Sequence, residues 1–438
     1  MPLSKAQQAE KENRRGGPLG KVKAYLKALG PGLVTGASDD DPSGIGTYSQ
    51  TGAQFGYTQL WTMPFTFPLM AGVQEICARI ALQTGSGLAE LLRKHYPKPV
   101  LYFCVSLLFI ANTVNIGTDL GAMAASAQLL VGLPFLAWLV GITLISVMVE
   151  IFVNYRQYAR MLRFLTLSLF AYVLVVFASA KDWGQISRNT LIPTIQGNSD
   201  YFFNLVAILG TTISPYLFFW QASQEIEEKI DEGKVTRAAR KGVTKVELKW
   251  MRTDVISGMV FSSLVMWAIM TTTASTLYPK GITSIDTAPK AAEALRPIAG
   301  DFAYLFFAAG IIGTGLLAVP ILAGSAAYAI AETFRLREGL YLKLRQAPGF
   351  YGIIAFSTLI GFAINLSGIN PMKALYYTAV LNGIVAPPLL FMIMLISNNQ
   401  KIMKDKVNGL ASNAMGWVTT IGMSIAALAL LLSLGYER

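Results

Sequence analysis

Long apolar runs recur along the whole chain and are separated by short polar segments. Eleven of them approach or exceed the roughly 20 residues that a helix needs to cross a hydrocarbon core of about 30 Å. They lie near residues 29–53, 58–83, 100–131, 134–154, 161–180, 201–224, 254–278, 302–334, 349–368, 374–397 and 415–435. The pattern therefore predicts an all-α membrane protein with eleven transmembrane helices.

Two of these runs cannot form continuous helices. The first contains Asp39, Asp40 and Asp41, followed directly by Pro42, and the sixth contains Ser214-Pro215. Proline removes a backbone donor and disfavours helix at the residue before it. Backbone groups freed in this way at membrane depth are tolerated only where protein or a water-filled cavity satisfies them. A carboxylate within the membrane is costly and usually functional, so the break at Asp41 is the stronger indication of a binding site.

The two breaks occupy matching places in the chain, with four complete runs between them. Interrupted helices at corresponding positions of two five-helix halves indicate an inverted-repeat transporter with its site near the membrane midplane. We therefore predict a first repeat at 20–180, a second repeat at 181–400, and a loop with an eleventh helix at 401–438. Residues 1–19 are polar and are expected to be a disordered N-terminus.

The distribution of charge predicts the orientation in the membrane. The formal charge is +11, and 28 of the 36 Lys and Arg residues fall in the N-terminus and in alternate loops. Positive residues concentrate on the cytoplasmic side, so the N-terminus is expected inside and, after eleven crossings, the C-terminus outside. The basic excess thus reflects topology and contact with anionic lipid of the inner (plasma) membrane, and no nucleic-acid partner is expected.

Composition narrows the function further. The chain is 53% hydrophobic and 14% charged, whereas soluble domains carry about 25% charged residues. Two cysteines, Cys77 and Cys104, lie inside apolar runs, which argues against a disulfide-stapled secreted protein. No cleavable signal peptide, nucleophile–base pair or phosphate-binding loop is apparent, so an enzyme is not expected.

The side chains at the breaks indicate what binds there. Asp41 precedes carbonyls that have lost their helical partners, and a carboxylate with free carbonyls forms a cation site. Hydroxyls and carbonyls from Ser38, Gly44, Thr211 and Ser214 add further hard oxygen donors, which suit Mg²⁺, Ca²⁺ or Mn²⁺. Asp39 and Asp40 line the aqueous approach, cap the break without touching an ion, or bind the ion directly, a role that suits Asp40 better than Asp39.

Several motifs resemble the NRAMP family of divalent-metal transporters, over nearly the whole chain. They are Gly30-Pro31-Gly32, Asp41-Pro42-Ser43-Gly44, Gly52-Ala53-Gln54-Phe55-Gly56-Tyr57, Gln74-Glu75 through Arg79, Thr84-Gly85, Thr118-Asp119 and Met403-Lys404-Asp405-Lys406-Val407-Asn408. The resemblance implies a LeuT-type fold with discontinuous helices 1 and 6. It also implies a metal ion as transported substrate and no cofactor.

The departures from the family pattern concern the metal site. Ser43 and Gly44 stand where the family has Gly and Asn, while Thr211, Ser214 and Tyr216 replace its Ala, Met and His. The family methionine supplies a soft sulfur that favours transition metals. The loss of this methionine leaves only oxygen donors, and the shorter side chains at Gly44 and Ser214 predict a wider cavity. Such a cavity suits an ion that keeps some of its waters, as Mg²⁺ does. The sequence therefore resembles the magnesium-transporting branch of NRAMP-related proteins.

Proton coupling is the second departure. The family's two sixth-helix histidines align with Tyr216 and Gln221, and the acidic positions flanking Asp119 align with Asn112 and Ala122. Histidine is the side chain that titrates near neutral pH, and the single histidine, His95, lies in a loop. Asp119 is either an isolated proton relay or a structural acid. Uncoupled transport is the prediction.

The predicted metal site thus comprises Asp41, Ser38, Gly44, Thr211, Ser214, Tyr216 and Asn382. Asn382 is the tenth-helix candidate that the resemblance implies, although an interhelical hydrogen bond is the commoner fate of such a residue; Asn115 and Thr378 are further polar positions near the cavity. A monomeric Mg²⁺-favouring transporter that also accepts Mn²⁺ is expected. The alternatives are a proton-coupled Mn²⁺ importer and an organic-solute transporter on the same fold.

Overall fold

The computed structural model describes residues 4–14, 17–152 and 170–436, and within them the regular structure is helical, without a strand. Nine long apolar helical segments match predicted spans. They are α5 (Thr62–Thr84), α7 (Lys98–Val131), α8 (Phe135–Phe152), α12 and α13 (Ser199–Thr212 and Pro215–Asp231), α15 (Lys245–Thr276), α18 (Ala303–Phe334), α19 (Pro348–Asn365), α20 (Pro371–Asn398) and α22 (Leu410–Tyr436).

The two remaining predicted spans differ from these nine. The first is the broken pair α3 (Pro31–Asp39) and α4 (Pro42–Phe55). Much of the predicted fifth span lies outside the described residues, which resume with α10 (Phe170–Ser179). Short elements complete the described chain: α1 (Lys5–Arg14), α2 (Gly17–Ala28), α6 (Leu88–His95), α11 (Trp183–Leu191), α14 (Arg237–Arg240), α16 (Ala288–Ala292), α17 (Arg296–Ala299), α21 (Gln400–Met403), and 3₁₀ turns at Gly56–Gln59, Tyr278–Lys280, Glu293–Leu295, Gly300–Phe302 and Lys404–Lys406.

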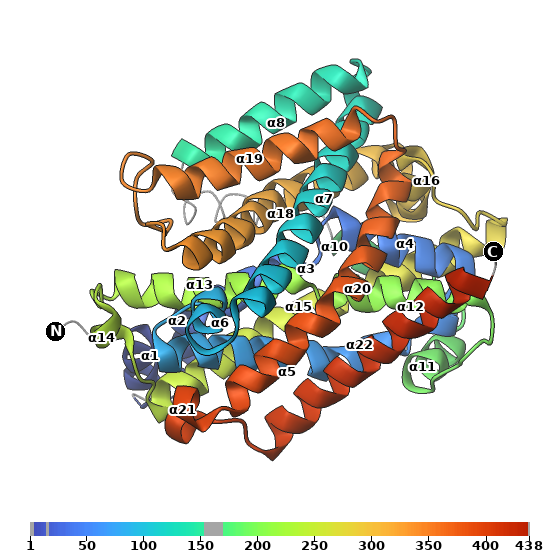
Figure 1. Cartoon of the computed structure of the whole chain (residues 1–438). Helices are drawn as coiled ribbons and strands as arrows, with labels where there is room; N and C mark the ends of the chain where they lie inside the picture. The colour runs from blue at the N-terminus through green and yellow to red at the C-terminus, as the bar shows by residue number, and fades with distance from the viewer. Residues whose placement is uncertain (1–3, 15–16, 153–169, 437–438) are drawn as a thin grey trace.

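The long helices form one bundle with α1 and the end of α22 at opposite ends (Figure 1). The broken helices α3–α4 and α12–α13 pass through its centre, with α15 and α20 alongside them. By contrast, α8, α19 and α22 lie at the periphery, where only 28%, 33% and 33% of their apolar windows are buried. Their exposed faces carry large apolar residues such as Phe152, Phe356 and Leu428, as expected for surfaces that contact lipid.

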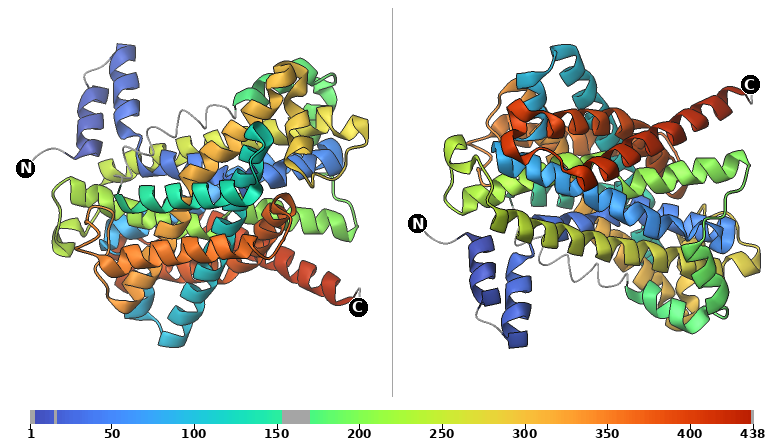
Figure 2. Two further views of the ribbon diagram at one scale, coloured as in Figure 1. Left: turned by 90° about the horizontal axis from the view of Figure 1, so that it is seen from above. Right: turned by 90° about the horizontal axis from the view of Figure 1, so that it is seen from below.

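Helix α1 and the first three residues of α2 lie within residues 1–19, for which the sequence predicts disorder. Helices α1 and α2 make a hairpin that stands beside the bundle (Figure 2). Polar contacts fix it to the bundle: Trp250 Nε1 donates to Glu10 at 3.1 Å, and the Lys5 backbone amide donates to Glu232 at 2.9 Å. These partners are distant in sequence, which is why composition alone predicts no order here.

Backbone contact between α3 and α15 positions the first half of the broken helix. A Cβ at Gly36 would lie 2.2 Å from the carbonyl oxygen of Gly258, and one at Gly258 would lie 2.1 Å from that of Gly32. Small residues allow helices to approach this closely in membranes. At the start of α3, Asp254 of α15 accepts the backbone amides of Gly30, Gly32 and Leu33 at 2.8, 2.7 and 3.1 Å.

The Gly258→Ala variant tests this contact. Its methyl group would overlap backbone, which cannot yield as a side chain can, so we expect a loss of about 1–3 kcal/mol of stability and a lower melting temperature in detergent. Gly422→Ala is the matched control, because nothing lies within 4 Å of its added Cβ. Equal melting temperatures for the two variants would contradict the close approach.

Candidate functional site

Asp41 lies at the start of α4, where the first broken helix resumes. Its Oδ1 accepts the Gly44 backbone amide at 2.8 Å and the Ser43 hydroxyl at 2.6 Å, which makes it the N-cap of α4. An acidic N-cap satisfies amides that the helix leaves free and complements the helix dipole. The sequence Asp-Pro therefore both stops α3 and starts α4, with the carboxylate held at the gap.

The second carboxylate oxygen of Asp41 faces two other helices. Asn115 of α7 donates to Oδ2 at 2.9 Å, and the Tyr216 hydroxyl of α13 lies 3.4 Å from the same atom. Tyr216 also donates to the Ser38 carbonyl at 2.8 Å, at the frayed end of α3. All these residues are buried, so the groups around Asp41 are shielded from solvent in this structure.

The break between α12 and α13 lies against the same space. Thr211 Oγ1 lies 3.4 Å from Ser43 Oγ. A Cβ at Gly44 would lie 3.2 Å from the Asp39 carbonyl oxygen and 3.4 Å from Thr211 Oγ1. The shorter distance is tighter than an ordinary contact, so the gap beside Gly44 does not accommodate a methyl group, and the missing side chain lets these two oxygens lie close to the start of α4.

The predicted site residues contribute in different ways. Asp41, Gly44, Thr211 and Tyr216 come together directly. The hydroxyls of Ser38 and Ser214 instead bond to carbonyls of their own helices: Ser38 to Val34 at 2.7 Å, and Ser214 to Thr211 at 2.7 Å and Gly210 at 3.0 Å. Ser38 therefore presents its carbonyl to the site, and Ser214 closes the end of α12.

Asn115 and Ser43 contact Asp41 directly but are absent from the predicted set. Asn382 joins the site through Asn115, whose Oδ1 accepts its amide at 3.4 Å. Asn115 could have been identified as an amide in the middle of an otherwise apolar span. Ser43 could have been identified from its position two residues after Asp41. Both signals are local, and neither reveals which way the side chain points.

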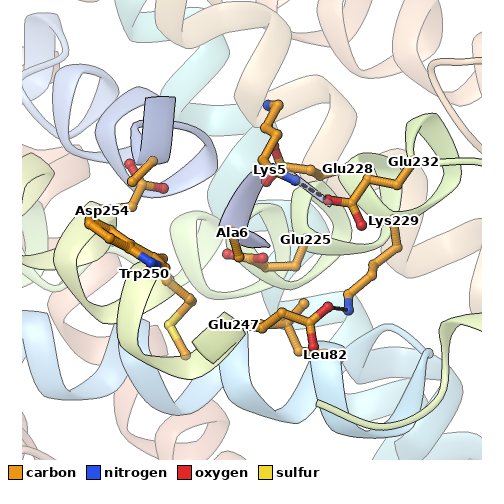
Figure 3. Close-up of a pocket in the computed structure, with 12 residues that line it drawn as sticks. Lys5, Ala6, Leu82, Glu225, Glu228, Lys229, Glu232, Glu247, Trp250 and Asp254 are labelled. Atoms are coloured by element: carbon orange, nitrogen blue, oxygen red, sulfur yellow. Dashed lines mark hydrogen bonds and ion pairs between the residues drawn. The ribbon is translucent and has the colours of Figure 1, made fainter. Parts of the chain in front are cut away.

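Further polar groups continue from the site along α13. Gln221 accepts a hydrogen bond from Thr35 of α3 at 2.6 Å and donates to Glu225 at 2.9 Å. Glu225 lines a cavity of about 50 Å³ that Figure 3 shows at the α1 end of the bundle. The cavity also contains Glu228, which pairs with Lys5, and Glu247, which pairs with Lys229.

A second acidic cavity lies at the same end, between α13 and α18. Glu227, Glu332 and Glu338 line its volume of about 90 Å³. Burial, with the nearby carboxylates of Glu332 and Glu90, raises the pKa of Glu338 to about 9. The surroundings of Glu338 therefore disfavour its charged form.

The comparisons with known proteins agree with this architecture. A family model described as natural resistance-associated macrophage protein-like (Nramp) matches residues 32–433. The chain belongs to the Nramp family. Members of this family are membrane transporters that carry metal ions as substrates without a cofactor, and they are not enzymes.

Among curated Nramp relatives, the divalent metal cation transporter MntH of Klebsiella pneumoniae subsp. pneumoniae is 26% identical over 410 residues, which is 93% of this chain and 92% of the relative. The solved Eremococcus coleocola manganese transporter superposes with a TM-score of 0.71 at 18% identity, covering 96% of this chain and 88% of that one. Mhp1, a nucleobase-cation-symport-1 transporter, gives 0.57 at 14% identity, covering 93% and 92%. These likenesses confirm the predicted LeuT-type fold.

Motifs quoted for the family resemblance meet at the α1 end of the bundle. Arg79 of α5 is 3% exposed and pairs with Glu75 at 3.1 Å. It also donates to the Lys406 carbonyl and to Asn408 Oδ1, both at 2.6 Å, in the loop before α22. These contacts tie the last helix to the core and lie away from Asp41.

A double-mutant cycle separates the roles of Asn115 and Asn382 in metal binding. Asn115→Ala removes a charge-assisted hydrogen bond that orients Asp41, and such bonds contribute about 1.5–3 kcal/mol; we expect metal affinity to fall at least about tenfold. If Asn382 acts through Asn115, Asn382→Ala has no further effect in the Asn115→Ala background. If the two substitutions instead reduce the metal affinity additively in calorimetric titrations, Asn382 contacts the ion directly.

Proposed function

We propose that this chain is a divalent-cation transporter that favours Mg²⁺, also accepts Mn²⁺, and works without proton coupling. The observation that supports this most is the chemistry around Asp41. Among the described residues, the groups that contact its carboxylate are a hydroxyl, a backbone amide, a side-chain amide and a phenol. None of them is a sulfur or an imidazole, so the contacts favour a hard ion.

The neutral oxygens around Gly44 are compatible with an ion that keeps part of its water. The Asp39 carbonyl and the Thr211 hydroxyl lie beside Gly44, and Asn115 and Tyr216 can accept or donate hydrogen bonds to water. Mg²⁺ dehydrates reluctantly and usually retains several waters. One carboxylate with neutral oxygens and retained water is therefore a suitable environment for it.

The absence of proton coupling is inferred from the groups that replace titratable ones. Tyr216 and Gln221 occupy the sixth-helix positions, where they bond to Ser38, Thr35 and Glu225 as neutral groups. Asn112 of α7 donates to the Leu322 carbonyl at 3.0 Å as a structural amide. The concentration gradient of the ion and the membrane potential would then drive uptake. The potential contributes ~2.3 kcal/mol per elementary charge per 100 mV.

The proposed orientation places α1, α6, α14 and α21 in the cytoplasm, with the C-terminus outside. These elements share one end of the bundle (Figure 1) and carry Lys and Arg residues. The positive-inside rule assigns that end to the cytoplasm. The acidic cavities along α13 would then form the cytoplasmic exit of a monomer that works by alternating access between its two repeats.

Transport by the protein in liposomes tests the proposal. We expect Mg²⁺ and Mn²⁺ uptake with no change of internal pH, reported by a dye inside the vesicles. Acidification that accompanies Mn²⁺ entry would favour the proton-coupled alternative. Asp41→Asn should weaken metal binding and uptake by about 100-fold, because it removes the negative charge of the carboxylate that binds the ion. Asp182→Asn is the control, since Asp182 is exposed and caps α11.

Selectivity is tested at Ser214. Ser214→Met restores a thioether beside the break, and a soft ligand favours Mn²⁺ over Mg²⁺. We expect the ratio of Mg²⁺ to Mn²⁺ dissociation constants to rise about tenfold, or ~1.4 kcal/mol. Ser214→Leu adds similar volume without sulfur and should leave the ratio near its original value. An equal change in both variants would show that size, not sulfur, controls the selection.

A further inference from the structure

Two carboxylates next to Asp41 are fully buried and take no part in the site described above. Asp39 and Asp40 are 1% and 0% exposed. Both approach one hydroxyl of α15: Ser262 Oγ lies 2.6 Å from Asp39 Oδ2 and 3.4 Å from Asp40 Oδ1. The other oxygens, Asp39 Oδ1 and Asp40 Oδ2, have no hydrogen-bond partner among the described residues.

Among the described residues, no Lys or Arg forms an ion pair with these two groups. None of the ion pairs among the described residues involves Asp39 or Asp40; those nearest along α15 and α5 use Glu247 and Glu75 instead. The charged groups that act on Asp40 are two other carboxylates, Asp39 and Asp41. An unpaired buried carboxylate is strongly unfavourable, so the pair is neutralised either by protons or by a bound cation.

The pair and Asp41 contact different helices. Asp41 points to Asn115 of α7 and Tyr216 of α13, whereas Asp39 and Asp40 point to α15. Neutral oxygens lie near this second space as well. The Tyr48 hydroxyl interacts electrostatically with Asp39 and Asp40. It lies 3.2 Å from Thr212 Oγ1. The break in the first helix therefore presents carboxylates to two separate sides.

We propose that Asp39 and Asp40, with the Ser262 hydroxyl, bind a second divalent cation between the α3–α4 break and α15. This inference rests on the proposed function, because the second ion belongs to the same hard class as the transported one. Two carboxylates balance the charge of one divalent ion, and their unpartnered oxygens are the donors that such an ion prefers. Protons alone satisfy the pair less well, since each new O–H needs an acceptor of its own.

The two sites are close enough to affect each other. Consecutive Cα atoms are about 3.8 Å apart, so two ions bound by the side chains of residues 40 and 41 lie within roughly 15 Å of each other. Two divalent ions at that distance repel one another strongly in a buried site. Occupancy of the second site therefore weakens binding at Asp41 and favours release of the transported ion, as neighbouring ions do in multi-site pores.

The number of bound Mn²⁺ ions tests the proposal on the purified full chain. Equilibrium dialysis should give two ions for wild type and one each for Asp39→Asn/Asp40→Asn and Asp41→Asn. The spin–spin coupling between two nearby Mn²⁺ ions, seen by electron paramagnetic resonance, should be present in wild type and absent in both variants. Asp182→Asn should keep two ions and the coupling.

The outcomes separate this inference from the proposed function. One ion in wild type that survives Asp39→Asn/Asp40→Asn but is lost in Asp41→Asn overturns the second site and leaves the first intact. No bound ion in wild type overturns both. Should the double variant not fold, Ser262→Ala keeps both carboxylates and removes one ligand. It should then weaken the second ion's affinity about tenfold and leave the first ion's affinity within a factor of two; an unchanged second affinity would also overturn the proposal.

Discussion

The charge on Asp41 is the constraint on which the rest of the site depends. A lone carboxylate in the middle of a membrane protein is unfavourable unless other groups solvate it. Here the start of α4 supplies an amide and a hydroxyl, α7 supplies an amide, and α13 supplies a phenol. One side chain thus fixes the relative positions of three helices. The same contacts hold the carboxylate where an ion can replace some of them.

The two broken helices solve the same backbone problem with different chemistry. At the first break a carboxylate satisfies the start of α4. At the second, the Ser214 hydroxyl satisfies carbonyls at the end of α12, and Pro215 has no backbone N–H that would need an acceptor at the start of α13. The first break therefore carries charge and the second is neutral. Because of this asymmetry, the first break attracts a cation electrostatically, whereas the second break contributes only neutral groups around it.

The sequence predicts the fold well because its signals are local. Apolar runs, Pro42 and Pro215 are each visible within about 20 residues, and nine apolar segments and both breaks appear where predicted. The directions of side chains are not local. Asn115 reaches Asp41 across 74 positions, and Ser262 reaches Asp39 across 223. The ordered α1 also escapes prediction, because its partners Glu228 and Trp250 lie on distant helices. Residues that share a site through packing cannot be paired without the structure.

The clamp formed by Asp254 has a mechanical consequence. Three amides at the start of α3 donate to this one carboxylate of α15, and charge-assisted bonds of this kind are roughly twice as strong as neutral ones. The contacts between α3 and α13, through Thr35–Gln221 and Tyr216–Ser38, join neutral groups. An opening at the α1 end of the bundle would therefore separate α3 from α13 more easily than α3 from α15. In such an opening, α3 would move together with α15 as one body.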